Sequence, residues 1–455
     1  MPVNPADSPV LGVLYGTEAM RAAMSERAFL QRMLDVEAAL ARAQSRLGIV
    51  PAEAASAITL AAQVDKLDLQ ALGDATRNTG YPVVGLVKQL TALAGHDAGR
   101  WTHWGATTQD IMDTAVVLQM RQGLALIRAE LIAVIGGFAA MAQRHRGTIM
   151  AGRTHLQHAL PVTFGYKVAV WLSPLITMLE RLEQLRPRVE RVQFGGAAGT
   201  LASLGEQGLA VQRELAAELG LGCPDIPWHV ARDGFTEAVS FLGLVCGALS
   251  KIATDVMLLM QTEVAEVNEP HVTGRGGSST MPQKRNPIAC EYILAQSRGV
   301  HALVPQMMAA MAQDLERGTG PWQAEALAIG QAFNLTHGAL SQARFLAEGL
   351  VVDPARMLRN LAATGGLIAS EQVMMGLAPV LGRGEAHHIV NRACDLAIAR
   401  GIPLVTALEQ DREIAARVDP ARLRALCNPE NYLGSATQFV DQVLARLAAP
   451  HGASR

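Results

Sequence analysis

The sequence predicts an all-α protein whose core is a bundle of long helices. Three observations favour this class: half of the 455 residues are apolar while only 4% are aromatic, apolar positions recur at helical spacing, and long stretches contain no proline. Such a composition is typical of helix packed on helix rather than of sheet. The length suffices for roughly two to four domains or for one elongated body.

Residues 1–111 are expected to form a small N-terminal helical domain. After an irregular start, apolar positions at helical spacing predict a first helix over 24–48. Shorter helices are expected over 52–69 and 78–94, and WTHWGATTQD at 101–110 is expected to be a polar loop.

Residues 112–364 are expected to form a central domain of long helices. The proline-free stretch 111–160 can hold one helix of about thirty-five residues, on the order of 50 Å long. A short polar turn at Arg153–Gln157 interrupts it, and kinks are expected at Pro174 and Pro187 of the next helix. Long segments are predicted over 162–192, 228–269, 288–313 and 323–349. Their apolar faces exceed what a monomer's surface tolerates, so association into a larger bundle is expected.

Residues 365–455 are expected to form a compact C-terminal helical domain, because the segments shorten and prolines punctuate them. The composition also predicts a cytoplasmic protein. The five cysteines contain no CxxC pair, which fits a reducing compartment and argues against a disulfide framework or a structural zinc site. The net charge of −2 gives no reason to expect nucleic acid or a membrane as partner, and the N-terminus does not resemble a signal peptide.

Three polar segments interrupt the apolar helical body: His103–Asp110, Arg153–Gln157 and Gly274–Asn286. The last reads GRGGSSTMPQKRN, in which glycines leave backbone amides free to meet an anion and several side chains offer donors. A flexible linker is the alternative interpretation, but the composition suits a substrate that bears carboxylates. At about 1.5 Å of rise per residue the three segments lie far apart in one chain, yet they can meet if subunits pack antiparallel.

The stretch GSSTMPQKRNP resembles the signature of the fumarase/aspartase superfamily. The segments MLDVEAALARAQ, HWGATTQDIMDTAVVLQMR, GRTHLQHALPVTFG, QFGGAAGTLASLG and MQTEVAEVNEP are similar to its 3-carboxy-cis,cis-muconate cycloisomerase branch. The resemblance implies a homotetramer in which three chains contribute to each active site. It also implies acid/base chemistry without a cofactor, on a small di- or tricarboxylate and through an aci-carboxylate carbanion.

The resemblance assigns roles to particular residues. Ser278 is the expected proton-abstracting base, and Lys284 with the loop amides stabilises its alkoxide. His155 is the expected proton donor or substrate ligand, and Glu291 orients its ring. Further substrate contacts are expected from His103, Thr107, Thr108, Thr154, Gln157, Ser279, Asn286 and Arg317.

Simpler structural roles remain open for several of these residues. Ser278 could be a turn hydroxyl bonded to backbone, and His155 a capping or core histidine. His103 could be a histidine buried between two tryptophans, and Arg317 a solvated charge at a helix end. A metal is not expected, since a His155/His158 pair has no acidic ligand at metal-site spacing.

Two reaction types fit the resemblance. The first is lactonisation of 3-carboxymuconate. Those cycloisomerases, however, tend to carry tryptophan at the position of His155 and no glutamate at that of Glu291. The presence of both residues here favours the second reaction type, that of a carbon–nitrogen lyase or epimerase that acts on an N-substituted aspartate or succinate and releases fumarate. Adenylosuccinate lyase fits less well, because Tyr81 and Ala326 replace its histidine and its phosphate-binding arginine. A non-enzymatic descendant is disfavoured by the intact site residues.

Overall fold

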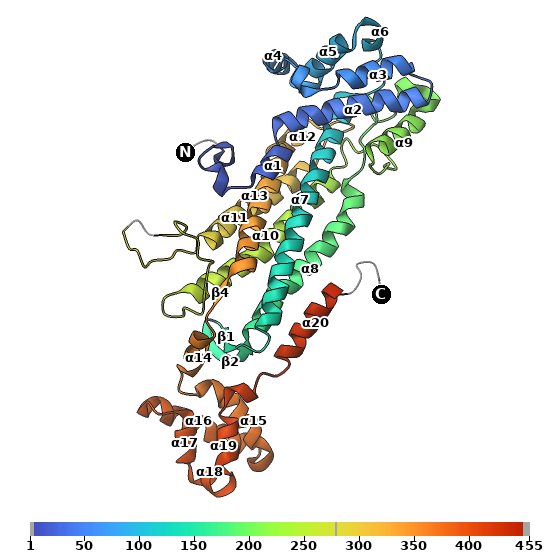
Figure 1. The fold of residues 1–455 in the computed structure, drawn as a ribbon. Coiled ribbons are helices and arrows are strands. Elements are labelled where there is room, and N and C mark those ends of the chain that lie inside the picture. The colour runs from blue at the N-terminus through green and yellow to red at the C-terminus, as the bar shows by residue number, and fades with distance from the viewer. Residues whose placement is uncertain (1–3, 278–279, 449–455) are drawn as a thin grey trace. The chain divides into compact units, whose positions relative to one another are not determined.

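The structure, a computed structural model, describes residues 4–277 and 280–448. Helices dominate these residues, and the all-α class is confirmed (Figure 1). The chain divides into two compact units. Unit 1 comprises Met1–Leu131, Met178–Leu249 and Tyr292–Ser341, and unit 2 comprises Ile132–Thr177, Ser250–Glu291 and Gln342–Arg455. The division into three domains at 111 and 364 stays a prediction.

The N-terminal part of unit 1 is a set of short helices around one longer helix. The helices are α1 (Glu18–Ala23), α2 (Glu26–Arg46), α3 (Ala52–Ala61), α4 (Leu69–Thr79), α5 (Pro82–Ala94) and α6 (His96–Gly99). The side chain of Ser25 accepts a hydrogen bond from the Ala28 amide and starts α2, and Gly80 ends α4 in the left-handed conformation. The predicted first helix over 24–48 is confirmed as α2.

The five predicted long helices are present, and each contributes at least part of its length to unit 1. They are α7 (Thr108–Arg144), α8 (Phe164–Val189), α10 (Asp233–Met260), α11 (Ile288–Ala310) and α13 (Ile329–Gly349). Helix α7 has 37 residues, close to the expected length, and α8 is one helix that continues through Pro174 and Pro187. Shorter helices α9 (Gly208–Leu219) and α12 (Pro321–Glu325) connect them.

Small residues let the long helices of unit 1 approach closely. A Cβ added at Gly123 of α7 would lie 2.6 Å from the ring of Phe333 on α13. One added at Gly299 of α11 would lie 2.8 Å from Leu335 of α13. Such distances leave no room for a larger side chain, so these glycines set the spacing of the bundle.

Unit 2 contains a β-hairpin that the sequence analysis did not predict. Strands β1 (Ile149–Thr154) and β2 (Gln157–Thr163) pair antiparallel, with Thr154 opposite Gln157 across the turn. The polar turn expected at Arg153–Gln157 is therefore the end of a hairpin and not a helical turn. His158 pairs with Arg153 in β1, so the one-face arrangement of His155 and His158 that a helical turn would give does not occur.

The C-terminal part of unit 2 is helical, as predicted. A two-stranded pair, β3 (Val267–Asn268) and β4 (Val351–Val352), precedes it. Its helices are α14 (Pro354–Ala362), α15 (Ser370–Leu381), α16 (Arg383–Arg400), α17 (Leu404–Glu409), α18 (Arg412–Arg417), α19 (Pro420–Leu426) and α20 (Ala436–Ala448). Helices α15 to α19 share an aliphatic core that includes Leu377, Ile389, Val390, Leu404 and Leu408.

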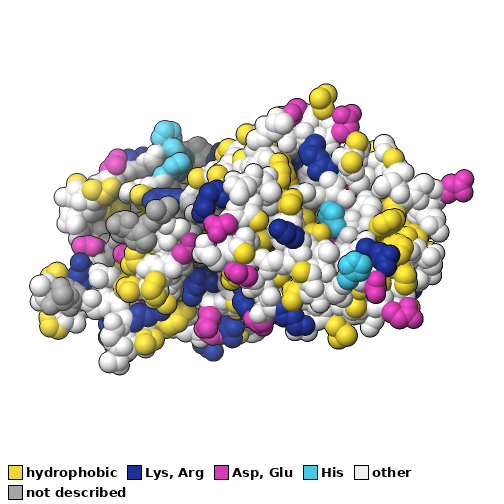
Figure 2. Space-filling model, turned by 90° about the horizontal axis from the view of Figure 1, so that it is seen from above, with side chains coloured by type: hydrophobic (Ala, Val, Ile, Leu, Met, Phe, Trp, Pro, Cys, Tyr) yellow, Lys and Arg dark blue, Asp and Glu magenta, His cyan; other side chains and the backbone are white. Residues whose placement is uncertain are grey.

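Helices α7 and α10 are long and apolar enough to cross a membrane by length and composition alone. In the single chain, 39% of the most apolar window of α7 and 50% of that of α10 are buried. Charge occurs within α10, where Lys251 and Asp255 form an ion pair at 2.5 Å. Figure 2 shows acidic and basic side chains interspersed with apolar ones over one face of the molecule.

Candidate active site

A carboxylate–histidine pair lies just before the start of α7 in unit 1. His103 adopts a left-handed backbone conformation with φ of 58°, which is uncommon for a residue with a side chain. The buried Glu37 of α2 holds it twice: Oε1 lies 2.6 Å from Nδ1, and Oε2 accepts a hydrogen bond of 3.1 Å from the backbone amide. Because Glu37 engages Nδ1, the ring's other nitrogen, Nε2, is left for a further partner.

The electrostatics of this pair favour a protonated ring. Burial opposes the charge of His103, but the Glu37 carboxylate outweighs it and Asp110 adds to the attraction. The pKa of His103 is therefore raised above its ordinary 6.5. A ring in this state presents a cationic donor, which suits a carboxylate ligand.

The polar residues at the start of α7 are joined to three distant segments of unit 1. Asp110 accepts hydrogen bonds of 2.9 Å from the amides of Gly195 and Gly196, and it lies 2.7 Å from Nε2 of the buried His229. Arg317 donates to Thr107 Oγ1 at 3.3 Å. The glycine-rich turn and the segment before α12 are thus both fixed against the polar residues that begin α7.

A buried charge cluster lies one turn further along α7. Arg232, at the start of α10, donates to Asp113 at 2.6 and 3.0 Å and to Glu325 of α12 at 2.5 and 2.9 Å. Trp322 Nε1 also donates to Asp113, at 3.0 Å. Burial raises the pKa of Glu325 despite the attraction of Arg232. This cluster ties α7, α10 and α12 together.

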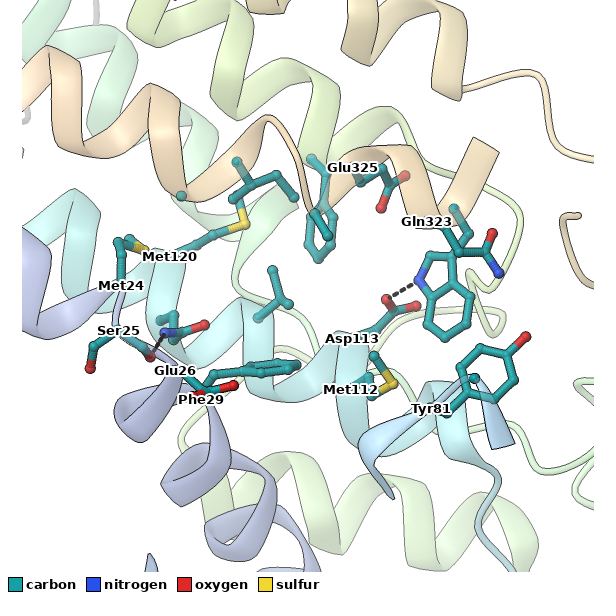
Figure 3. Close-up of a pocket in the computed structure, with 18 residues that line it drawn as sticks. Met24, Ser25, Glu26, Phe29, Tyr81, Met112, Asp113, Met120, Gln323 and Glu325 are labelled. Atoms are coloured by element: carbon teal, nitrogen blue, oxygen red, sulfur yellow. Dashed lines mark hydrogen bonds between the residues drawn. The ribbon is translucent and has the colours of Figure 1, made fainter. Parts of the chain in front are cut away.

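A cavity of ≈480 Å³ opens beside this cluster (Figure 3). Met112, Asp113 and Met120 of α7 form one wall, and Tyr81 and Trp322 stack with ring centroids 5.6 Å apart. The residues at and just before the start of α2, Met24, Ser25, Glu26 and Phe29, add a further part of the lining next to α7. The cavity is large enough for a small-molecule ligand.

The hairpin of unit 2 presents its predicted site residues to solvent. Thr154, His155 and Gln157 are exposed, and His155 and Leu156 both have positive φ, of 50° and 66°. The hairpin is fixed next to its turn, because Arg153, which pairs with His158 beside the turn, makes a two-point ion pair with the buried Glu266 at 2.7 and 3.0 Å. The turn that carries His155 is thus strained and held in place, which is common for functional side chains.

The signature loop, also in unit 2, is folded back on itself. Gly277 and Arg285 form an isolated antiparallel bridge, and the Asn286 amide donates to Gly276 O at 3.0 Å. Lys284 and Asn286 line a cavity of ≈210 Å³. Ser278 and Ser279 lie outside the described residues.

Only some of the predicted site residues lie together in one chain. The structure joins Arg317 to Thr107, which with Thr108 and His103 makes up the unit 1 part of the candidate site. Lys284 and Asn286 share the loop cavity of unit 2. Neither a hydrogen bond nor an ion pair joins His155 to Glu291 within this chain, where both residues are described and both are exposed.

Glu37 and the anchoring function of Asp110 were not predicted from the sequence. Glu37 had a detectable signal: it falls on the buried face of α2 at the same spacing as Met33, Leu34 and Leu40. A carboxylate on an apolar helix face needs a partner, which points to a cationic or hydrogen-bonding group elsewhere in the chain. The partner itself, 66 residues away, is not indicated by that spacing.

The chain matches known families and proteins along most of its length. The lyase family matches residues 15–301, and the adenylosuccinate lyase C-terminus family matches residues 366–443. The 3-carboxy-cis,cis-muconate cycloisomerase of Bradyrhizobium diazoefficiens is 44% identical over 98% of this chain and 99% of its own. Trans-aconitate decarboxylase 1 of Mycosarcoma maydis is 44% identical over 96% of this chain and 88% of its own length. Nitrosuccinate lyase of Streptomyces davaonensis is 40% identical over 98% of this chain and 96% of its own length.

Solved structures give the same result at the level of the fold. A fumarate lyase from Mesorhizobium sp. BNC1 has a TM-score of 0.90 and 50% identity, covering 95% of this chain and 98% of that one. The 3-carboxy-cis,cis-muconate lactonizing enzyme from Pseudomonas putida has a TM-score of 0.92 and 41% identity, covering 97% and 100%. The chain belongs to the lyase family of the fumarase/aspartase superfamily, whose members are cycloisomerases and lyases.

Proposed function

We propose that this protein is an acid/base enzyme that needs no cofactor and acts on a small di- or tricarboxylate, most like 3-carboxy-cis,cis-muconate cycloisomerase. The observation that carries the proposal is the 44% identity to the Bradyrhizobium diazoefficiens cycloisomerase over 98% of this chain. The cationic and amide-bearing loop around Lys284 and Asn286 supports it, because such a loop can stabilise charge that develops on a carboxylate.

The proposed chemistry passes through a carbanion next to a carboxylate. In the elimination direction the Ser278 alkoxide takes the proton from that carbon, and the electron pair moves into the carboxylate to form the aci-carboxylate. The bond to the leaving atom then breaks, and His155 protonates that atom. Lactonisation follows the same path in reverse: a carboxylate oxygen of the substrate adds to the double bond, and the carbanion takes up a proton.

The remaining residues would hold the substrate's carboxylates. His103, Thr107, Thr108 and Arg317 offer donors in unit 1, where Arg317 already contacts Thr107. Thr154 and Gln157 flank His155 on the hairpin, and Lys284, Asn286 and Ser279 belong to the signature loop. In this proposal Glu291 orients the ring of His155.

We further propose that the enzyme is a homotetramer whose active sites combine residues of neighbouring chains. Two features support this. The apolar helices α7 and α10 are incompletely buried in the single chain, and extensive apolar surface indicates an interface. His155 and Glu291 are both exposed and unjoined, as expected if each meets its partner across a subunit boundary. The cytoplasm remains the expected location.

The alternative is a lyase or epimerase that acts on an N-substituted aspartate or succinate and releases fumarate. The presence of both His155 and Glu291 favours it, and so does the 40% identity to nitrosuccinate lyase. Adenylosuccinate is a less suitable substrate. Tyr81 and Ala326 line the cavity of unit 1, and they occupy the positions of the functional histidine and the phosphate-binding arginine of adenylosuccinate lyase.

An ultraviolet assay separates the two reactions. Loss of muconate absorbance supports the cycloisomerase, and appearance of fumarate from substituted succinates supports the lyase. Ser278→Ala should abolish turnover in whichever assay is positive, while Thr280→Ala, two residues along the loop, serves as the control. Full turnover by Ser278→Ala in that assay would refute the mechanism.

A further inference from the structure

We propose that the ≈480 Å³ cavity of unit 1 holds an uncharged, apolar group of the substrate, beside the residues that bind its carboxylates. The inference rests on the proposed function and adds to it a substrate class: carboxylates with an apolar substituent that carries a ring or a branched chain. Three properties of the cavity lead to this conclusion, namely its position, its charge and the shape of its walls.

The cavity adjoins the unit 1 part of the candidate site. Met112, Val116 and Met120 recur every four residues on α7 and face the cavity. Thr108 occupies the preceding position of the same face, one turn nearer the start of the helix. A ligand whose carboxylate accepts a hydrogen bond from Thr108 can therefore reach the cavity with the rest of its structure.

A second segment makes the same connection. Arg317 contacts Thr107, and five residues later Trp322 contacts Asp113. The segment that carries both residues thus runs alongside the first two turns of α7, with its polar end at the carboxylate-binding residues and its aromatic end in the cavity wall.

The charge of the walls excludes an anionic group. Glu26, Asp113 and Glu325 line the cavity, and no lysine, arginine or histidine is among its eighteen lining residues, all of which are described. Arg232 lies behind two of the acids and is fully engaged by them, so it offers no free donor to a ligand. A third substrate carboxylate would meet acidic and apolar neighbours there, at a cost in desolvation that nothing repays.

The shape of the walls favours a ring. The rings of Tyr81 and Trp322, stacked with their planes inclined by 29°, give the cavity an aromatic lining at one side. Phe29, Met112 and Met120 supply further aromatic and thioether contacts (Figure 3). Methionines adapt to irregular ligands and make favourable contacts with aromatic rings.

The first experiment measures binding with two probes of one shape and different charge. Benzyl alcohol should bind the wild-type protein with a Kd in the millimolar range, and benzoate should bind at least tenfold more weakly, by ligand-observed NMR. Ala326→Phe places a large ring at an exposed position of the lining and should weaken binding of benzyl alcohol tenfold or more. Leu327→Phe is the matched control, because Leu327 is the next residue, is exposed and does not line the cavity.

Val116→Phe fills the same space from α7 and gives a second, independent test should Ala326→Phe fail to fold. Equal binding of both probes, or binding of benzyl alcohol that neither filling variant weakens, would overturn the proposal.

The second experiment links the cavity to turnover. Among succinates that share one leaving atom, a benzyl-substituted compound should exceed its methyl counterpart at least tenfold in kcat/KM, and Ala326→Phe should reduce that ratio to about one. If no succinate or muconate is turned over while benzyl alcohol still binds, the proposed function fails and the cavity assignment stands. If turnover occurs with a ratio that Ala326→Phe leaves unchanged, the cavity assignment fails alone.

Discussion

The Glu37–His103 pair gives a prediction about a single ionisable ring. Glu37→Gln keeps the shape and one hydrogen bond but removes the charge that outweighs burial, so the pKa of His103 should fall below 6.5. NMR of protein labelled with ¹³C at histidine Cε1 measures this, with His103→Gln to assign the signal. The stabilisation from the raised pKa is present below the unfolded value of 6.5 and is lost as pH rises through the folded value.

A matched control exists for this pair. His96 lies beside Asp97 at 3.4 Å, but both side chains are exposed, at 96% and 89%. Asp97→Asn removes the carboxylate of this exposed pair and should leave the His103 signal unchanged, because solvent screens exposed charges. An unchanged His103 signal in Glu37→Gln would show that the carboxylate does not control the ring.

His337 predicts how the protein responds to acid. Its ring is buried in unit 1, where Nδ1 lies 2.8 Å from Thr17 Oγ1, and burial lowers its pKa to about 4. Between pH 6.5 and 4 the unfolded chain binds the proton more readily than the folded one does. The free energy of unfolding should therefore decrease by about 3 kcal/mol as the pH is lowered through this range. His337→Gln should flatten this slope in urea unfolding between pH 7.5 and 5, and His96→Gln should not.

Individual side chains were predictable only where a local pattern marked them. Thr107 and Arg317 were expected to bind substrate, and the structure places them in contact, although their role stays a prediction. Glu37 was missed because its partner is 66 residues away, and pairs of that kind depend on how helices cross. The spacing of apolar residues along one helix indicates which face of that helix is buried. A contact between residues of two helices can be predicted only if the relative position of the two helices is known.

At the scale of elements, the Arg232 cluster predicts an order of stabilities. Arg232→Met leaves Asp113 and Glu325 buried without a cation, which should cost about 3–5 kcal/mol. Glu325→Gln should cost less, since burial already raises the pKa of that carboxyl. Urea midpoints at pH 7.5 test the order, and adding Asp113→Asn and Glu325→Gln to Arg232→Met should recover most of the loss. Equal costs for the two single variants would contradict this account.

The hairpin shows why one element escaped prediction while the long helices did not. Each long helix is marked by its own apolar periodicity, which needs no partner. The strands of 149–163 contain only six and seven residues, and their sequence continues the apolar character of α7. Their identity depends on pairing across a two-residue turn in which His155 and Leu156, rather than glycines, have positive φ. Without glycine or asparagine there, the usual turn signal is absent.

For the whole molecule, the sequence predicted the helical class and also association into a larger bundle. The single chain consists of two compact units. The polar segments that the proposal unites are distributed between these units: His103–Asp110 is in unit 1, and the hairpin tip and the signature loop are in unit 2. An experiment that mixes chains with different substitutions can therefore test whether each active site combines residues of different subunits.

Mixing two inactive variants answers that question. If Ser278 and His155 enter each site from different chains, tetramers reassembled from equal amounts of Ser278→Ala and His155→Ala contain about one site in four with both native residues, so about a quarter of the activity should return. Ser278→Ala mixed with Lys284→Ala is the matched control, because both residues lie in one loop of one chain and no mixture can restore it. Return of activity in neither mixture, with hybrid tetramers confirmed by native mass spectrometry, would place both groups in a single chain.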